Sequence, residues 1–187
     1  MVGAEGYAGI IEPLLDEFGA PPVIVGHSFG GRVAVCLAAS NRGRVGRLVL
    51  TGSPLIRLGP GRPPSFGFRV ARALNRIGVL SDQRMEAMRR SRGSADYRAA
   101  TGVMRDILVK VVNESYETQL RALDVPVSLI WGSDDREVPV TVAERALSII
   151  REGGGVAELE VLPGVGHLLP TEAPQALRRM VEEALES

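Results

Sequence analysis

The fold of this chain is decided by one short stretch, Val23-Ile24-Val25-Gly26-His27-Ser28-Phe29-Gly30-Gly31. It begins with three β-branched apolar residues, which favour a buried strand. A serine follows, with a glycine two places before it and two places after it, and an apolar helical pattern comes next. Such a turn between a strand and a helix predicts an exposed serine hydroxyl at a sharp bend. We expect side chains at Gly26 and Gly30 to collide with neighbouring backbone. The alternative is a glycine-rich turn that carries a serine by chance.

Apolar strands alternate with helical patterns on both sides of this turn. Helical patterns cover residues 7–18, 31–39, 139–152 and 173–185, and buried-strand patterns cover residues 23–25, 48–50, 125–131 and 157–162. This alternation predicts an α/β fold with a mostly parallel sheet flanked by helices. In such a sheet, functional side chains gather at the carboxyl ends of the strands.

Residues 54–121 differ from the segments around them. A loop rich in glycine and proline, residues 59–64, leads into several amphipathic segments with no convincing strand. A block of helices between two strand units predicts an insertion. We therefore assign residues 1–53 and 122–187 to an α/β core and residues 54–121 to a helical cap. The aromatic residues Phe66, Phe68, Tyr97 and Tyr116 either line an apolar pocket or pack the cap helices together.

Composition narrows the class of protein. The length of 187 residues suits one domain with an inserted subdomain, and a net charge of zero gives no indication of a nucleic-acid or membrane partner. The single cysteine, Cys36, lies in an apolar helical pattern and is predicted to be a small buried hydrophobe. The sequence shows neither a transmembrane run nor a secretory signal, so we expect a cytoplasmic protein.

Polar side chains with the residue types of a nucleophilic site follow three of the strands. Ser28 follows one strand, the pair Asp134 and Asp135 follows another, and His167 follows the last. A serine hydroxyl is a poor nucleophile at neutral pH, so it needs a base within reach and a carboxylate that orients the base. The order serine, acid, histidine is expected for this kind of turn. At the helix N-terminus, the backbone N–H of Phe29 is placed to bind a developing oxyanion.

Each of these residues also has a simpler interpretation. A loop histidine is usually a surface or structural residue, and a loop pair of aspartates is often a solvated turn. We favour His167 as the base because it follows the last strand, and we interpret His27 as a packing group whose side chain points away from that of Ser28. Asp134 and Asp135 both stay open. The sequence lacks metal-ligand spacing and a nucleotide-binding glycine pattern, so we expect no metal and no cofactor.

Three motifs together resemble the α/β-hydrolase fold family, in the branch with a serine nucleophile and a helical cap. They are residues 26–31, 129–139 and 164–174, in family-like order and spacing, and the resemblance covers essentially the whole chain. The resemblance implies Ser28 as the nucleophile and His167 as the base. It implies Asp135 as the orienting acid, because the family's aspartate typically stands three residues before a Val-Pro pair, here Val138-Pro139.

The chain departs from this family in what precedes the nucleophile strand. Family members usually carry several strands there, together with a His-Gly loop that supplies the second oxyanion donor. Since strand 23–25 is the first in this chain, four of the usual eight strands and half of the oxyanion hole are expected to be missing. We expect strand 23–25 to be an exposed apolar edge. The chain is then either a shortened form of a longer hydrolase or pairs that edge with another chain.

The resemblance implies a hydrolase that acts on a small ester or related acyl substrate through an acyl-enzyme. Reactions such as C–C bond hydrolysis, haloperoxidase-like, peptidase and lyase chemistry reuse the same residues and stay open, because a fold does not decide a substrate. A non-catalytic fragment that acts as a binding protein is the alternative of a different class. We expect a small-molecule substrate, no nucleic-acid or membrane partner, and self-association through the edge at residues 23–25.

Overall fold

The computed structural model describes residues 3–57, 74–76, 81, 84 and 114–186. The chain divides into two compact units, between residues 57 and 58 and between residues 112 and 113. All elements below belong to the unit that holds both ends of the described chain, which we call the core unit. It extends further than the predicted limits of residues 53 and 122, because Leu55, Tyr116 and Leu120 are buried with its core. The helices predicted between residues 66 and 111 lie almost entirely outside the described residues.

Four parallel strands form the sheet of the core unit, in the order β1-β2-β3-β4. They are β1 (Val23–His27), β2 (Arg47–Thr51), β3 (Val127–Gly132) and β4 (Ala157–Leu162). All four predicted strands are confirmed, and with them the parallel α/β fold. β3 begins two residues later than predicted, after Pro126, which has no N–H to donate to a neighbouring strand.

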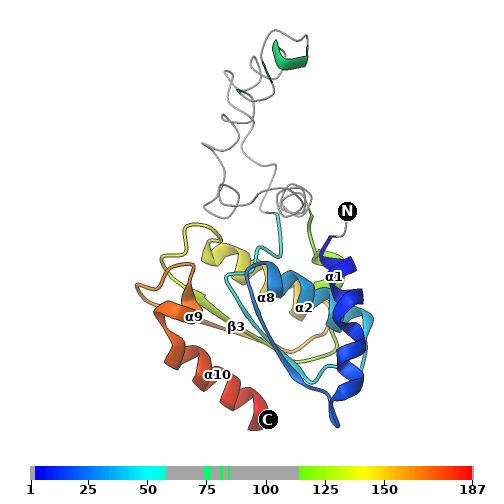
Figure 1. Ribbon diagram of the computed structural model, residues 1–187. Helices are drawn as coiled ribbons and strands as arrows, with labels where there is room; N and C mark the ends of the chain where they lie inside the picture. The colour runs from blue at the N-terminus through cyan, green and yellow to red at the C-terminus, as the bar shows by residue number, and fades with distance from the viewer. Residues whose placement is uncertain (1–2, 58–73, 77–80, 82–83, 85–113, 187) are drawn as a thin grey trace. The chain divides into compact units, whose positions relative to one another are not determined.

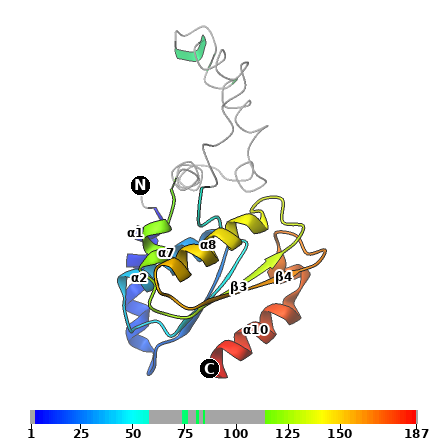
Figure 2. The ribbon, with the colours of Figure 1, turned by 180° about the vertical axis from the view of Figure 1, so that it is seen from behind.

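Helices cover both faces of this sheet (Figures 1 and 2). They are α1 (Ala4–Ile11), the 3-10 helix η1 (Glu12–Glu17), α2 (Phe29–Ser40), α7 (Glu117–Arg121), α8 (Val140–Glu152), α9 (Leu169–Glu172) and α10 (Pro174–Glu186). α2 lies against β1 and β2, and α8 against β3 and β4. α10 contacts β1, β2 and β3 from the opposite face, as both views show.

The first predicted helix differs from the observed one. A single α-helix was expected over residues 7–18, whereas the α-helix ends at Ile11 and continues as η1. Pro13 explains the change, because it lacks the N–H that would bond to the preceding turn of an α-helix. The short helix α9 is not anticipated by the helical spacing, which first becomes regular in α10.

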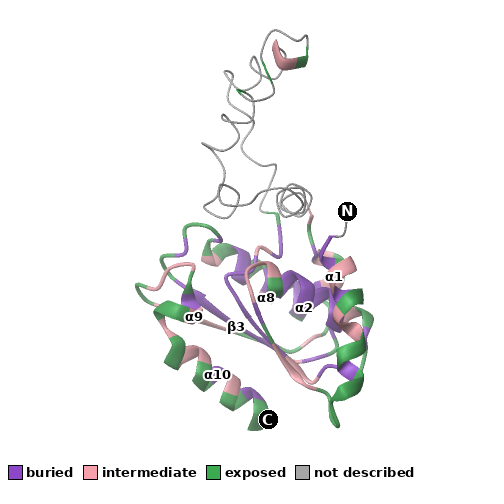
Figure 3. Cartoon of the chain, in the orientation of Figure 1, coloured by how far each residue is buried: buried purple, intermediate pink, exposed green. Residues whose placement is uncertain are grey.

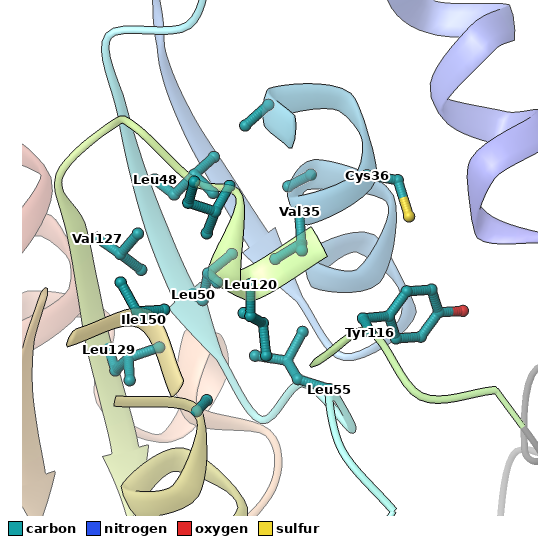
Figure 4. Packing of buried hydrophobic residues seen from close by; sticks show 14 of the residues in the cluster. Val35, Cys36, Leu48, Leu50, Leu55, Tyr116, Leu120, Val127, Leu129 and Ile150 are labelled. Carbon is teal, nitrogen blue, oxygen red and sulfur yellow. The ribbon is translucent and has the colours of Figure 1, made fainter. Parts of the chain in front are cut away.

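The main hydrophobic core lies between the sheet and the helices α2, α7 and α8. Figure 4 shows part of it, with Leu48, Leu50, Val127 and Leu129 of the strands near Val35 of α2, Leu120 of α7 and Ile150 of α8. A smaller cluster on the other face contains Val49, Ile130, Leu169, Met180 and Ala184. Successive residues of a strand point to opposite faces, so each apolar strand supplies both clusters. Each fully buried side chain of this size contributes roughly 1.5–3 kcal/mol.

β1 lies at an edge of the described sheet, beside β2 alone. Its residues are mostly half-buried, and the side chain of Val25 is 45% exposed. β3 is buried along its whole length, as Figure 3 shows. None of the helices in the described residues is long and apolar enough to cross a membrane.

Candidate active site

Ser28 occupies a strained turn between β1 and α2. Its φ of 50° and ψ of −118° make it the one non-glycine residue with a positive φ in the described part of the chain. Such a conformation costs about 1–3 kcal/mol and persists where the surroundings hold it, commonly at functional sites. The backbone holds it here, through hydrogen bonds from Ser28 N to Thr51 O (3.0 Å) and from Gly31 N to Ser28 O (3.2 Å). The predicted strand–turn–helix setting of the serine is therefore present.

Close approach of the backbone explains two glycines of this turn. A Cβ on Gly26 would lie 2.6 Å from Gly31 Cα, so the prediction for Gly26 is confirmed. The same prediction is wrong for Gly30, where a Cβ would meet no atom of the described residues within 4 Å apart from its chain neighbours and the backbone of its own helix. The second required glycine is Gly31, whose Cβ would lie 1.9 Å from Ser53 Oγ. The turn is thus packed against the end of β2 through its third glycine and not its second.

Phe29 is the first residue of α2. Backbone N–H groups in the first turn of a helix have no acceptor within the helix, so the N–H of Phe29 has none there. The aromatic ring packs edge-on against Tyr7 of α1, with 5.5 Å between the ring centroids. This contact packs the start of α2 against α1. The role of the Phe29 N–H as an oxyanion donor stays a prediction.

His167 and Asp135 lie together on the loops that follow β4 and β3. His167 Nδ1 is 2.9 Å from Asp135 Oδ2, and the two side chains are 11% and 1% exposed. A carboxylate offers only acceptors, so Nδ1 donates, and Nε2 of a neutral imidazole is left as an acceptor. Asp135 Oδ1 accepts from the backbone N–H groups of Glu137 (3.0 Å) and Val138 (2.8 Å). With both oxygens engaged, the orientation of Asp135 is determined.

Asp134 has different partners. It is exposed, its Oδ1 accepts from Ser133 Oγ (2.9 Å), and its N–H donates to Val165 O (2.9 Å). Ser133 Oγ also accepts from Gly164 N (2.8 Å). Asp134 and Ser133 thus join the two loops, whereas Asp135 meets the histidine. Geometry separates the two aspartates that position in the sequence left open.

His27 and Gly52 lie beside His167. The rings of His27 and His167 are 5.1 Å apart at an angle of 48°. Gly52 has a φ of +53°, and a Cβ there would lie 3.1 Å from Cε1 and Nδ1 of His167 and 3.2 Å from Cε1 of His27. Sequence reasoning predicted packing for His27 but missed that it packs on the other histidine. The available signal was that the chain has only two histidines and both follow predicted strands.

Ser28 and His167 are not joined by a hydrogen bond among the contacts of the described residues. His167 Nε2 instead lies 3.9 Å from Glu137 Oε2. Catalytic hydrogen bonds are often long in free enzymes and shorten when substrate binds. Sequence reasoning gave Glu137 no role, although it stands two residues after Asp135.

Within the described ranges, no group of three or more His, Cys, Asp or Glu side chains could hold a metal ion.

Buried polar groups lie beneath the turn, on α2. Arg32 Nε donates to Pro54 O (2.9 Å), and its guanidinium lies 5.8 Å from the centroid of the Tyr116 ring. Burial lowers the pKa of Arg32 and raises that of Tyr116. Cys36 is buried, as predicted, and burial raises the pKa of its thiol to about 12. Tyr116 packs in the core of this unit, whereas Phe66, Phe68 and Tyr97 lie outside the described residues.

Curated proteins with related sequences include several hydrolases. The chain is 30% identical over 202 residues to 2-hydroxy-6-oxononadienedioate/2-hydroxy-6-oxononatrienedioate hydrolase 1 of Dechloromonas aromatica (strain RCB), covering 95% of this chain and 67% of the relative. It is 27% identical over 179 residues to the monoglyceride lipase of Homo sapiens, covering 90% and 58%. The chain spans about two thirds of the first of these relatives and less of the second.

Solved structures share the fold. A bromoperoxidase from Bacillus anthracis superposes with a TM-score of 0.68 at 16% identity, covering 99% of this chain and 75% of that one. A meta-cleavage product hydrolase from Pseudomonas fluorescens IP01 superposes with a TM-score of 0.60 at 22% identity, covering 98% and 70%. The model of the alpha/beta hydrolase family matches residues 3–180. With this match, the parallel sheet and the turn at its first strand, the chain belongs to the alpha/beta hydrolase family.

Proposed function

We propose that this chain carries a hydrolase site in which Ser28 is the nucleophile, His167 the base and Asp135 the orienting acid. The substrate class is a small ester or a related acyl or carbonyl compound. The observation that carries the proposal is the 2.9 Å contact between His167 Nδ1 and the buried Asp135 Oδ2. The hydrolase names of several relatives support an alpha/beta hydrolase enzyme.

In the proposed reaction, acyl transfer takes two steps. Ser28 Oγ attacks the carbonyl carbon while His167 Nε2 takes the hydroxyl proton, and the N–H of Phe29 donates to the oxyanion. His167 then returns the proton to the leaving group, which leaves an acyl group on Ser28. Water, deprotonated by His167, releases the acid and restores the serine. Asp135 holds the imidazole and stabilises its charged form in both steps.

The substrate stays at the level of a chemical class. The relatives are named for an oxo-dienedioate, for monoglycerides and, in Rhodococcus erythropolis, for haloperoxidase activity. Attack on a carbonyl carbon is shared by ester hydrolysis and by C–C bond hydrolysis next to a ketone, so the same three side chains serve both. We place ester hydrolysis first because the leaving group of an activated ester departs with the least assistance.

A second candidate is a binding protein that keeps the turn without a working site. One observation favours it: among the described residues, Ser28 Oγ is not a hydrogen-bond partner of His167, whose Nε2 lies 3.9 Å from Glu137 Oε2 instead.

Labelling with a fluorophosphonate separates the two candidates. We expect the folded protein to be labelled on Ser28, and the rate to fall by at least about 10³-fold in His167→Ala, because the hydroxyl loses its base. Ser28→Ala should abolish labelling, and Ser40→Ala, which changes an exposed serine of α2, should not affect it. Absence of labelling in wild-type protein that melts cooperatively would contradict the proposal and favour the binding protein.

A further inference from the structure

Glu172 binds the backbone on both sides of His167. Its Oε2 accepts from the N–H of Gly166 at 2.7 Å, and its Oε1 accepts from the N–H of Leu168 at 3.1 Å. Hydrogen bonds to a carboxylate are roughly twice as strong as those between neutral groups. The two peptide groups that flank the histidine are therefore bound by a single side chain.

The core holds Glu172 in place through α9. Glu172 is the last residue of this helix, and its N–H donates to Leu168 O (2.9 Å). Leu169, at the start of the helix, is fully buried in the cluster beneath α10. From the other side, Asp134 N donates to Val165 O, so the loop is bound to both neighbouring segments. The carboxylate of Glu172 is exposed to solvent, but its position is determined by buried structure.

We infer that Glu172 is a positioning residue for His167. By fixing the peptide groups before and after the histidine, it directs Nδ1 toward Asp135 and keeps Nε2 as the nitrogen that faces away from it. The inference rests on the proposed role of His167 as the base. It is needed because the chain that carries His167 is otherwise a loop between β4 and α9, and loops of this kind are mobile unless they are bound.

Capping of α9 is the simpler explanation and accounts for only one of the two bonds. A glutamate near the start of a helix often accepts from the N–H of the N-cap residue, and Leu168 is the N-cap residue of α9. Gly166 lies two residues before the N-cap, outside the helix. The 2.7 Å bond to Gly166 is the shorter of the two, and it serves the loop and not the helix.

Substitution of Glu172 tests the inference against an internal control. Glu172→Ala removes both bonds, and we expect kcat for p-nitrophenyl acetate to fall about 10–100-fold with KM nearly unchanged, because misplaced catalytic groups cost rate more than binding. Glu172→Gln keeps one acceptor oxygen and should fall between. Thr171→Ala removes the bond from Thr171 Oγ1 to Leu168 O (2.9 Å) in the same helical turn and should leave kcat unchanged.

A measurement independent of activity completes the test. The chain has two histidines, so the Nδ1–H resonance of His167 can be assigned in a 15N-histidine spectrum by its loss in His167→Ala. We expect this proton to exchange with water at least about tenfold faster in Glu172→Ala, and at the wild-type rate in Thr171→Ala, because the opening of the loop becomes easier.

The outcomes separate the two proposals. If wild-type protein is neither labelled nor active but Glu172→Ala still accelerates the exchange, the proposed hydrolysis fails and the positioning of His167 stands. If Glu172→Ala lowers the melting temperature as Thr171→Ala does and changes neither kcat nor the exchange rate, Glu172 only caps α9 and the inference is overturned.

Discussion

The two edge strands of the described sheet are built differently. β4 carries Glu158 and Glu160, whose carboxylates lie 3.7 Å from Arg47 and 2.6 Å from Arg179. β1 has no acidic or basic residue before His27, and Val25 is 45% exposed. Charged side chains on an edge strand discourage pairing with another chain, so β4 has the composition of an edge and β1 that of an interior strand.

The same difference divides the candidate site. His167, after β4, is oriented by Asp135 and by the backbone bonds of Glu172. Ser28, after β1, is held by a strained backbone and by the glycine contacts beneath it. The contacts that hold His167 lie within the core unit, whereas Ser28 follows a strand at the edge of the described sheet. We therefore expect the two halves to respond differently to substitution.

The largest effect is expected in the histidine half. Asp135→Asn leaves the shape but offers His167 an amide that favours the wrong tautomer, and kcat for an activated ester should fall on the order of 10⁴-fold. Asp134→Asn makes the same change one residue earlier, on an exposed side chain, and should stay within about twofold, as most surface substitutions do. Steady-state ester hydrolysis measures both. Equal losses in the two variants would contradict the separate roles of the aspartates.

Cys36 reports whether α2, which lies against β1, is as tightly packed as the structure shows. Its ordinary pKa of 9.0 is raised to about 12 in the folded protein, so its thiolate fraction at pH 8 is roughly 10³-fold lower than in the unfolded chain. Iodoacetamide should therefore modify native protein about that much more slowly than denatured protein. The contribution of the buried, protonated thiol to the free energy of unfolding is fully present below pH 9, and it is lost as the pH rises toward 12. Rapid modification of native protein would show that α2 packs less tightly than the structure shows.

Gly52 lies where the two halves meet, and Gly43 offers a matched control. Both have a positive φ, +53° and +74°, so an alanine at either site should lower the free energy of unfolding by about 1–2 kcal/mol. The added methyl group meets His167 and His27 at position 52, and at position 43 it meets no atom within 4 Å in the described part of the chain. We expect kcat to fall about 10–100-fold in Gly52→Ala alone. Denaturant titration measures the free energy of unfolding of both variants, and ester hydrolysis measures their kcat. An equal loss of kcat in the two variants would show that contact with His167 is not its cause.

The smallest expected change concerns assembly. We expect the open side of β1 to pair with a second copy of the chain at micromolar concentration, about doubling the mass, because unpaired apolar edges associate. Val25→Lys should restore the monomer. Val156→Lys introduces the same charge at a valine that is 70% exposed beside β4, and should not change the mass. Sedimentation velocity distinguishes these cases, and a monomeric wild-type protein would exclude the edge as a self-association site.

Much of the fold could be predicted from local patterns. β4 was predicted with its observed limits, and β1 and β2 within two residues at each end, because apolar β-branched runs between turns are local signals. The break after Ile11 was missed because the apolar spacing continues through Pro13, and spacing does not register a missing N–H. α9 was missed because a single turn is too short to show a period.

The part of the candidate site that could be predicted also depends on local patterns. Position after a strand end selected Ser28 and His167 but did not separate Asp134 from Asp135, because adjacent residues follow the same strand. Gly31 was missed because its need arises from Ser53, more than twenty residues away. Glu172 was missed because its function lies in two bonds to backbone N–H groups, which have no signature in the sequence.

By itself, the sequence determined the alternation of strands and helices, the turn around Ser28 and the order serine, acid, histidine, because these depend on residue types at short separations. The resemblance implied Asp135 from its spacing to Val138-Pro139, but only the tertiary structure showed its contact with His167, the close approach of Gly31 to Ser53, and the bonds of Glu172 to the loop of the histidine. These contacts depend on which side chains the loops bring together after the sheet has formed. For residues 23–31, the sequence predicted the shape of the turn, and the tertiary structure placed their strand at an edge of the described sheet.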